Sequence, residues 1–158
     1  MAATIALAAA IMVGASGCTF AANIATQKPY DPSDGVGTTL GPVSVRNVLL
    51  ITDEGNNLNL VVTVANNSDE VIDLQVEWNL DRTEGQEFIE LDPMSLTELG
   101  GPDEQRIVID GTDVVVGSLV PIFFTYEGAE GSQVQVPVLD GSLPEYELYV
   151  PPVTPESD

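Results

Sequence analysis

The sequence predicts an all-β protein, folded as an antiparallel β-sandwich with Greek-key connections and about seven or eight strands. Three observations predict it. Short runs rich in valine, isoleucine and leucine recur after residue 42, and most of them alternate apolar with polar residues. Clusters of glycine, proline, asparagine and aspartate separate these runs. No segment after residue 42 has the apolar period of an amphipathic helix.

An apolar N-terminal segment precedes the predicted strands. Residues 3–17, ATIALAAAIMVGASG, are apolar or small and lead directly to Cys18, the only cysteine. The run is shorter than the roughly 20 residues of a transmembrane helix, and it lacks the polar side of a core helix. Both features are typical of a secretion signal peptide. The alternative is a chance apolar start.

The small residues before Cys18 resemble the bacterial lipobox. The sequence there is Ala15-Ser16-Gly17-Cys18, and in a lipobox the cysteine thiol receives a diacylglyceryl group while the preceding residues are removed. Ala15 stands where the pattern prefers leucine and a basic n-region is absent, so a cleaved signal without lipidation is the alternative. Two acyl chains give stable membrane attachment. We therefore predict lipidation at Cys18, membrane lipid as a partner and a location on the extracytoplasmic face of the cell membrane.

The predicted organisation has four parts. Residues 1–17 are the signal peptide, and residues 18–42 are the lipidated cysteine and a flexible tether rich in proline and glycine. Residues 43–150 form the sandwich domain, and residues 151–158, PPVTPESD, form a disordered tail. Within the tether, DPSDG at residues 31–35 predicts a turn, because it lacks the spaced ligands of an EF-hand calcium loop.

Acidic residues far outnumber basic ones. The chain has 25 Asp and Glu against 4 Lys and Arg, a formal net charge of −21, and every charged residue follows Cys18. Such a chain repels the phosphates of nucleic acids, so we predict no nucleic-acid partner. The acidity is explained by the solubility of an extracellular domain, with a cation-collecting surface as the alternative.

The clearest strand patterns lie in the first half of the domain. Residues 43–52, VSVRNVLLIT, are apolar on both parities, which predicts a strand covered on both faces. Residues 58–66 and 72–80 alternate and are joined by NNS at 66–68, which predicts an antiparallel hairpin. The NNS sequence also matches a glycosylation acceptor, but a turn is the simpler interpretation. Trp78 has the apolar parity, so we expect a core residue, with stacking on a ligand as the alternative.

Shorter patterns follow in the second half. Pro137, inside the last clear one, predicts an edge strand or the end of a strand. The predicted segments are residues 88–91, 106–110, 114–116, 120–126 and 133–138, with a last short strand at 146–150.

Few side chains of this chain are suited to catalysis. It has no histidine, which removes Ser-His-Asp triads and histidine metal ligands, and no nucleophile elbow, P-loop or dinucleotide motif. We therefore predict no enzyme, no catalytic residue and no cofactor. A glycosidase would need two carboxylates facing one groove, and we interpret the clustered carboxylates instead as residues of solvated faces and turns. The clustered carboxylates are Glu87, Glu90, Glu98, Asp103, Glu104, Asp110 and Asp113.

Four short motifs carry a resemblance to a known family. They are GPVSVRNV at residues 41–48, NNS at 66–68, LVPIFF at 119–124 and QVQVPV at 133–138. With the lipobox and linker, they resemble the pattern of actinobacterial lipoproteins of the LpqE-like family, which implies an envelope lipoprotein.

The same layout is similar to periplasmic copper chaperone domains of the PCuAC type. This resemblance implies a cupredoxin-like sandwich, within the cupredoxin- or immunoglobulin-like class that the strand pattern predicts. Those domains hold Cu(I) with histidine and methionine. This sequence has no histidine, and Met94 is its only methionine after Cys18, so their ligands are missing and the metal site is unknown.

Together these observations predict a membrane-anchored extracytoplasmic lipoprotein with a non-enzymatic binding or structural role at the cell envelope. The alternative is a metal-related envelope protein, either a degenerate copper chaperone or a carboxylate site for Ca²⁺. A third interpretation is an accessory subunit with an envelope protein as its partner, which predicts a contiguous apolar patch on one sheet face.

Overall fold

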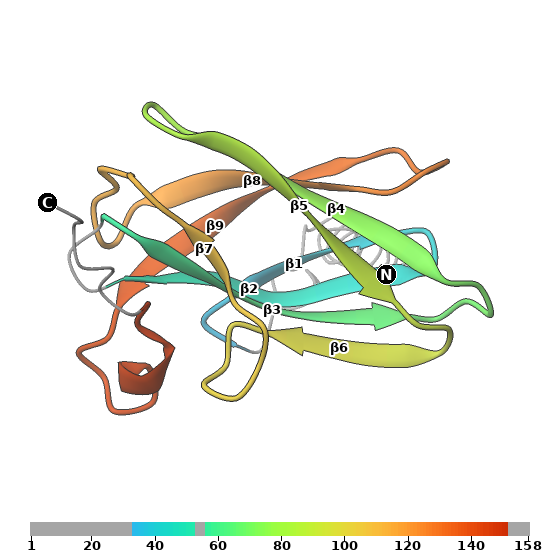
Figure 1. The fold of residues 1–158 in the computed structure, drawn as a ribbon, viewed down its shortest axis with the longest axis horizontal. Helices are drawn as coiled ribbons and strands as arrows, with labels where there is room; N and C mark the ends of the chain where they lie inside the picture. Colours follow the sequence, from blue (N-terminus) through green and yellow to red (C-terminus); the bar gives the residue numbers. More distant parts are fainter. Residues whose placement is uncertain (1–32, 53–55, 152–158) are drawn as a thin grey trace, which may run out of the picture. The chain divides into compact units, whose positions relative to one another are not determined.

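The computed structural model of the chain describes residues 33–52 and 56–151. Regular structure in these ranges is almost all β-strand, as the sequence predicted (Figure 1). No helix in them is long and apolar enough to cross a membrane. The elements are β1 (Val36–Leu40), β2 (Val43–Thr52), β3 (Leu58–Asn66), β4 (Ile72–Asn79), β5 (Glu84–Leu91), β6 (Ser95–Leu99), β7 (Ile107–Ile109), β8 (Leu119–Thr125), β9 (Ser132–Asp140) and the 3₁₀ helix η2 (Glu147–Tyr149).

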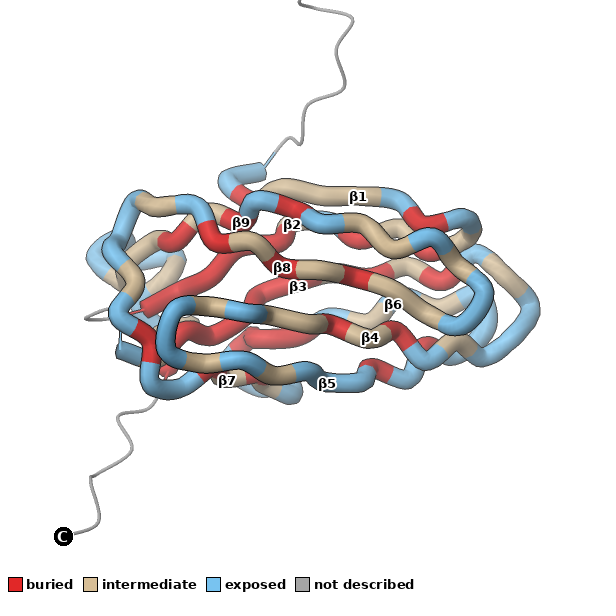
Figure 2. Tube along the Cα trace, turned by 90° about the horizontal axis from the view of Figure 1, so that it is seen from above, coloured by how far each residue is buried: buried red, intermediate tan, exposed pale blue. Residues whose placement is uncertain are grey.

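Two layers of strands pack face to face (Figure 2). The order β5-β4-β8-β9 forms one layer, and β9 continues into β2-β3-β6 of the other, with β1 paired to β2 and β7 to β3. This arrangement confirms the predicted β-sandwich. One pairing differs from an all-antiparallel sheet, because β9 is parallel to β2 over its last residues, Val138 to Asp140. The parallel pair forms where β9 leaves β8 and runs along the other layer.

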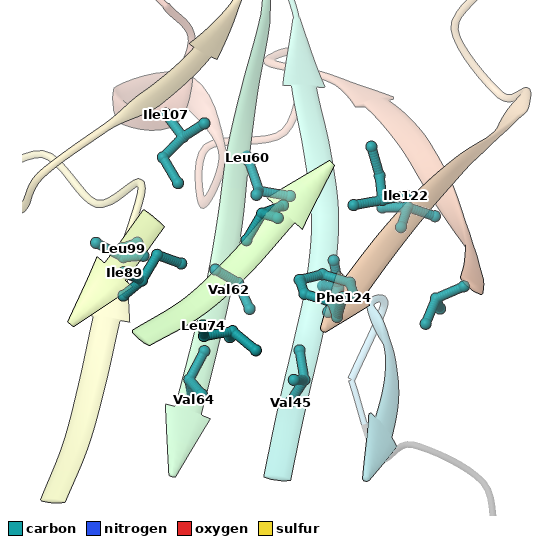
Figure 3. Close-up of a cluster of buried hydrophobic side chains, with 14 of the residues drawn as sticks. Val45, Leu60, Val62, Val64, Leu74, Ile89, Leu99, Ile107, Ile122 and Phe124 are labelled. Carbon is teal, nitrogen blue, oxygen red and sulfur yellow. The ribbon is translucent and has the colours of Figure 1, made fainter. Parts of the chain in front are cut away.

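Alternate residues of both layers form one core between them (Figure 3). Strand β4 contributes Leu74 and Val76, and β8 contributes Ile122 and Phe124, all with no exposed surface. Every second residue of β3 from Leu58 onward faces them. Burial of these apolar side chains is the main force that holds the layers together.

A bulge in β2 explains why that strand is apolar on both parities. Its register with β3 slips at Asn47, whose φ is 50°. Val45 faces the main core before the bulge and Leu50 faces it afterwards. A bulge adds one residue and so exchanges the two parities. Leu49 and Ile51 consequently lie on the outer side, where they form a second buried cluster with Val61.

The C-terminal segment, residues 141–151, covers this second cluster. Tyr146, Tyr149 and Val150 pack against it. The side chain of Asn59 is buried and donates hydrogen bonds to the carbonyl oxygens of Gly100 and Tyr149, both at 2.8 Å.

Arg106 also holds this segment to the sheet. Its guanidinium donates to the carbonyl oxygens of Leu148 at 2.8 Å and Val150 at 3.2 Å. The short strand predicted at residues 146–150 is therefore wrong, since the segment forms turns and η2. Its backbone is hydrogen-bonded within local turns and by the side chains of Asn59 and Arg106, and not by a neighbouring strand.

Several other elements differ from the prediction. Strands β1 and β6 were not predicted, and β5 begins at Glu84, before the predicted start at residue 88. Residues 114–116 form no strand. The sequences VGTTL and SLTEL of β1 and β6 carry little apolar signal. Both become strands because an apolar neighbour, β2 or β3, offers them a free edge.

Pro137 lies inside β9 and not on an edge strand. Val138 directs both its N–H and its carbonyl toward the β8 side. The nitrogen of Pro137 therefore faces the opposite side, where the pairing with β2 begins only at Val138. The N–H that proline lacks would therefore point to the side where β9 is not yet paired with β2, so no hydrogen bond between these strands is lost.

Candidate functional site

A row of four outward side chains crosses one layer of the sandwich. Glu77 of β4 lies opposite Gln86 of β5 on one side and Phe123 of β8 on the other, and Phe123 lies opposite Gln133 of β9. Glu77, Phe123 and Gln133 each have at least one buried neighbour in sequence, so their own side chains face away from the core. Gln86 lies on the same face, because it is paired directly with Glu77. The strand pairing therefore brings together residues from four separate strands.

This row lines a hollow of about 520 Å³ on the outer face. That volume lies within the range of about 300–1,000 Å³ typical of ligand sites. The other lining residues come from the same strands and are Trp78, Asn79, Glu84, Gly85 and Pro121. The lining thus combines aromatic rings, amides and carboxylates and contains no basic side chain.

A glycine lies beside the aromatic ring of Phe123, which lines the hollow. A Cβ at Gly131 would overlap the ring of Phe123. The missing side chain therefore lets the ring lie close to the backbone beside it. Phe123 is half-buried, unlike the exposed Phe88 on the same face.

Trp78 lies between the main core and the outer hollow and contributes to both. It is half-buried and packs against the main core, which confirms the expected core role. It also lines the outer hollow, because its cross-strand neighbour is Gly85. A Cβ at Gly85 would lie 2.6 Å from Trp78 Cζ2, so only glycine leaves the indole in this position. The indole Nε1 is buried and has no hydrogen-bond partner among the described residues.

The carboxylates of the hollow have no basic partner in the described part of the chain. The arginines there are engaged elsewhere. Arg46 donates to backbone and side-chain oxygens of β1, Arg106 holds the C-terminal segment, and Arg82 pairs with Asp113 at 2.7 Å. Glu77 and Glu84 therefore present negative charge to the hollow without an internal counter-charge.

The residues singled out in the sequence do not form a catalytic cluster. Cys18 lies outside the described residues, and so do the first residues of the 31–35 turn. The clustered carboxylates are all exposed, which supports their interpretation as solvated faces and turns; they are Glu87, Glu90, Glu98, Asp103, Glu104, Asp110 and Asp113. No group of three or more His, Cys, Asp or Glu within residues 33–52 and 56–151 is arranged to hold a metal. Met94 is exposed in a turn.

The turn predicted at residues 66–68 is confirmed, but the antiparallel hairpin predicted across it is wrong. β3 pairs with β2, β6 and β7, whereas β4 pairs with β5 and β8, so the turn connects the two layers and not two neighbouring strands. Asn66 is buried and donates hydrogen bonds to the carbonyl oxygens of Glu70 at 2.8 Å, Asp92 at 3.0 Å and Leu91 at 3.2 Å. Its own Oδ1 accepts from the backbone and hydroxyl of Ser68. Asn66 therefore ties the β3–β4 turn to the β5–β6 turn and has a structural role.

Sequence reasoning missed the outer hollow. One signal for it was present in the Phe123-Phe124 pair. Adjacent strand residues face opposite sides, so one of two neighbouring phenylalanines has to face outward. The pairing that places Glu77 and Gln133 beside that ring depends on strand order, which the alternation does not contain.

Two further hollows lie elsewhere on the domain. One of about 360 Å³ is lined by residues of both ends of the described chain, including Asp34 and Tyr146. The hydroxyl of Tyr146 donates to Asp34, and this hydrogen bond raises the pKa of Tyr146 to about 12. The other, of about 330 Å³, lies beside the exposed Arg82–Asp113 pair. Neither combines an outward aromatic ring with unpaired carboxylates.

Solved structures share this fold. One described as "Copper-bound PCuAC domain from PmoF2" matches with a TM-score of 0.52 and 14% identity over 66% of this chain and 98% of that one. Another, "apo PmoF2 PCuAC domain", matches with a TM-score of 0.53 and 15% identity over 68% and 98%. No protein-family pattern and no curated protein sequence matches the chain. The distant similarity to PCuAC domains that the sequence predicted is thereby confirmed for the fold alone.

Proposed function

We propose that this chain is a lipid-anchored extracytoplasmic lipoprotein whose sandwich has a non-enzymatic binding role at the cell envelope. The observation that carries the binding role is the outer hollow lined by Glu77, Gln86, Phe123 and Gln133. Its lining is suited to holding a ligand and holds no histidine or thiol to act as base or nucleophile. The lipobox-like sequence before Cys18 supports the anchor.

The location is tested by the intact mass of the protein from membranes of its native host. We expect the mass of residues 18–158 plus a diacylglyceryl modification, with the protein retained in the membrane fraction. The Cys18→Ala variant should lose both the modification and the retention. An unmodified full-length mass in the soluble fraction would overturn the anchor.

The non-enzymatic role is tested by a search for turnover. Incubation with ester, glycoside and peptide substrates should give no product above the uncatalysed rate. Hydrolysis that disappears on changing one carboxylate, for example Glu77→Gln or Glu84→Gln, would show catalysis and contradict this part of the proposal.

A metal-related role is the second candidate, because one neighbour in fold is described as a copper-bound domain. Against it, the described residues hold no ligand cluster for a metal. Titration calorimetry with Cu(I) and with Ca²⁺ separates the two functions. We expect no binding tighter than about millimolar, the weak end for extracellular calcium modules. A tighter saturable heat would favour the metal role.

A further inference from the structure

We infer that the outer hollow binds the positively charged alkylammonium group of a ligand. This inference rests on the proposed binding role of the hollow and adds the chemical class of the ligand. Three features of the described residues support it: an outward aromatic ring, carboxylates beside it and the absence of a basic residue in the lining.

The charge of the lining selects a cation. Glu77 is half-buried and lies directly opposite Phe123 across the β4–β8 pair, and Glu84 lines the same hollow. Their negative charge excludes anions such as phosphate and carboxylate. Partial burial lowers the effective dielectric around Glu77, which strengthens its attraction for a cation relative to open solvent. Arg46, Arg82 and Arg106 do not line the hollow, and their contacts are made elsewhere.

The aromatic ring selects an alkylated cation over a hydrated metal ion. The face of an aromatic ring attracts an ammonium or quaternary ammonium group placed within about 6 Å. Gly131 allows the ring of Phe123 to lie close to the backbone, so the ring is positioned before a ligand arrives. Pro121 adds apolar surface for methyl or methylene groups. The ring and carboxylate together supply the dispersion contact and the charge that such a group requires.

The amides at the two ends of the row add hydrogen-bond acceptors. Gln75 donates to Oε1 of Gln86 at 2.9 Å, which orients the Gln86 carboxamide. A carbonyl oxygen has two lone pairs, so Gln86 can accept a second hydrogen bond. Gln133 lies at the opposite end beside Phe123. These groups favour a primary ammonium, which donates three hydrogen bonds, whereas the ring alone favours a quaternary one.

The experiment is a nuclear magnetic resonance titration of the full lipidated chain in a polyoxyethylene detergent. The probe is tetramethylammonium chloride, with sodium chloride at equal ionic strength and neutral tert-butanol as matched controls. We expect saturable shifts of the backbone amides of Glu77, Phe123 and Gln133 with tetramethylammonium only. Shifts of equal size with tert-butanol, or no saturable shift with the ammonium, would overturn the inference.

Matched variants locate the site. Phe123→Leu should weaken tetramethylammonium binding about two- to five-fold, the size of a cation–π contact at an accessible site. Glu77→Gln should weaken it by a similar factor. Phe88→Leu and Glu98→Gln, exposed residues that do not line the hollow, should leave it unchanged. Amide spectra and melting temperatures of all four variants report whether the fold is kept. Unchanged binding in both hollow variants would refute the assignment.

Two further probes identify the source of the cation. Choline represents a quaternary headgroup or small molecule, and N-acetyl-lysine methylamide represents a lysine side chain of a protein. Tighter binding of either supports the inference and names the source. Neutral oligosaccharides that bind the hollow in preference to every cation would overturn the ammonium assignment and leave the binding role intact. The anchor is tested separately by mass and fractionation, so the failures are distinguishable.

Discussion

Two adjacent phenylalanines of β8 have opposite roles. Phe124 is fully buried in the main core, and Phe123 is half-buried on the outer face. We expect Phe124→Ala to lower the free energy of unfolding by about 3–5 kcal/mol, the usual cost of emptying an aromatic core site. Phe123→Ala should cost about 1 kcal/mol, because only part of its ring is removed from water. Urea denaturation measures both, and equal costs would contradict the assigned faces.

Gly100 is required by its backbone conformation and by its neighbours. Its φ is 88°, and a Cβ there would overlap the carbonyl oxygen of Leu60. Gly100→Ala should therefore combine the cost of a left-handed conformation, about 1–2 kcal/mol, with about 1–3 kcal/mol of steric displacement. Gly111 has a φ of 69° and nothing within 4 Å, so Gly111→Ala is the matched control and should show the first cost alone. Thermal denaturation compares the two, and equal destabilisation would exclude the steric part.

The hydrogen bond from Tyr146 to Asp34 predicts a pH dependence. It raises the pKa of Tyr146 from the ordinary value of 10.0 to about 12. The protonated phenol is the form that folding favours, so its stabilisation is fully present below pH 10 and is lost as the pH rises through 12. Ultraviolet absorbance of tyrosinate should show a late titration that disappears in Tyr146→Phe. Asp34→Asn keeps an acceptor and removes the charge, so it should lower this pKa only in part. A wild-type Tyr146 that titrates with the ordinary value would contradict the contact.

At the scale of elements, the C-terminal segment is held to the sheet by hydrogen bonds to its backbone carbonyls as well as by apolar packing. Arg106→Met keeps most of the apolar stem and removes the donors to the carbonyls of Leu148 and Val150. Hydrogen bonds from a charged donor contribute about 1.5–3 kcal/mol each when buried, and these are partly exposed, so we expect a total loss of about 1–3 kcal/mol. Amide hydrogen exchange should accelerate in residues 146–150 while the core of β3 stays protected.

Arg82→Met is the control for that experiment. Arg82 pairs with Asp113 at the surface, where both side chains are more than half exposed. Surface ion pairs contribute about 0–1 kcal/mol, so this variant should change neither global stability nor exchange in the C-terminal segment by a comparable amount. If the two variants lose equal stability, the cause is the removal of a positive charge and not the loss of the hydrogen bonds from Arg106 to the carbonyl oxygens.

Strand pairing explains which elements the sequence predicted well. Residues 43–52 and 72–79 form strands with almost the predicted bounds, because their own apolar patterns specify a buried face. β1 and β6 depend instead on the edges that β2 and β3 offer, and the segment at 146–150 depends on Arg106 and Asn59. These contacts join residues distant in sequence, so no local pattern contains them.

At the scale of the whole molecule, the net charge of −21 works against the folded state. Like charges repel more strongly in a compact chain than in an expanded one, and salt screens that repulsion over about 10 Å at 0.1 M. We expect added sodium chloride to raise the melting temperature by about 4 °C, equivalent to roughly 1 kcal/mol for a domain of this size. The Glu87→Gln, Glu90→Gln double variant should respond less. A melting temperature that falls with salt would show that attractive pairs dominate.

The negative charge of the chain agrees with the positive charge of the proposed ligand. The sequence left two explanations of the acidity open, namely solubility and a surface that collects cations. The fold makes a specific form of the second testable, because it places Glu77 and Phe123 opposite each other across β4 and β8, where both line the hollow. The remaining acidic residues on turns and outer faces are consistent with solubility. Both explanations can therefore hold in different parts of the molecule.

The sequence by itself determined the fold class, the strands with strong alternation, the turn at residues 66–68 and the absence of histidine chemistry. It also carries the predicted lipidation at Cys18, which lies outside the described residues and stays a prediction. Only the tertiary structure decided the strand order, the bulge at Asn47, the covering of β2 and β3 by the C-terminal segment, and the hollow. The physical reason is that alternation tells which face of a strand is buried. Which strands become neighbours depends on long-range packing, and that packing places Phe123 beside Glu77.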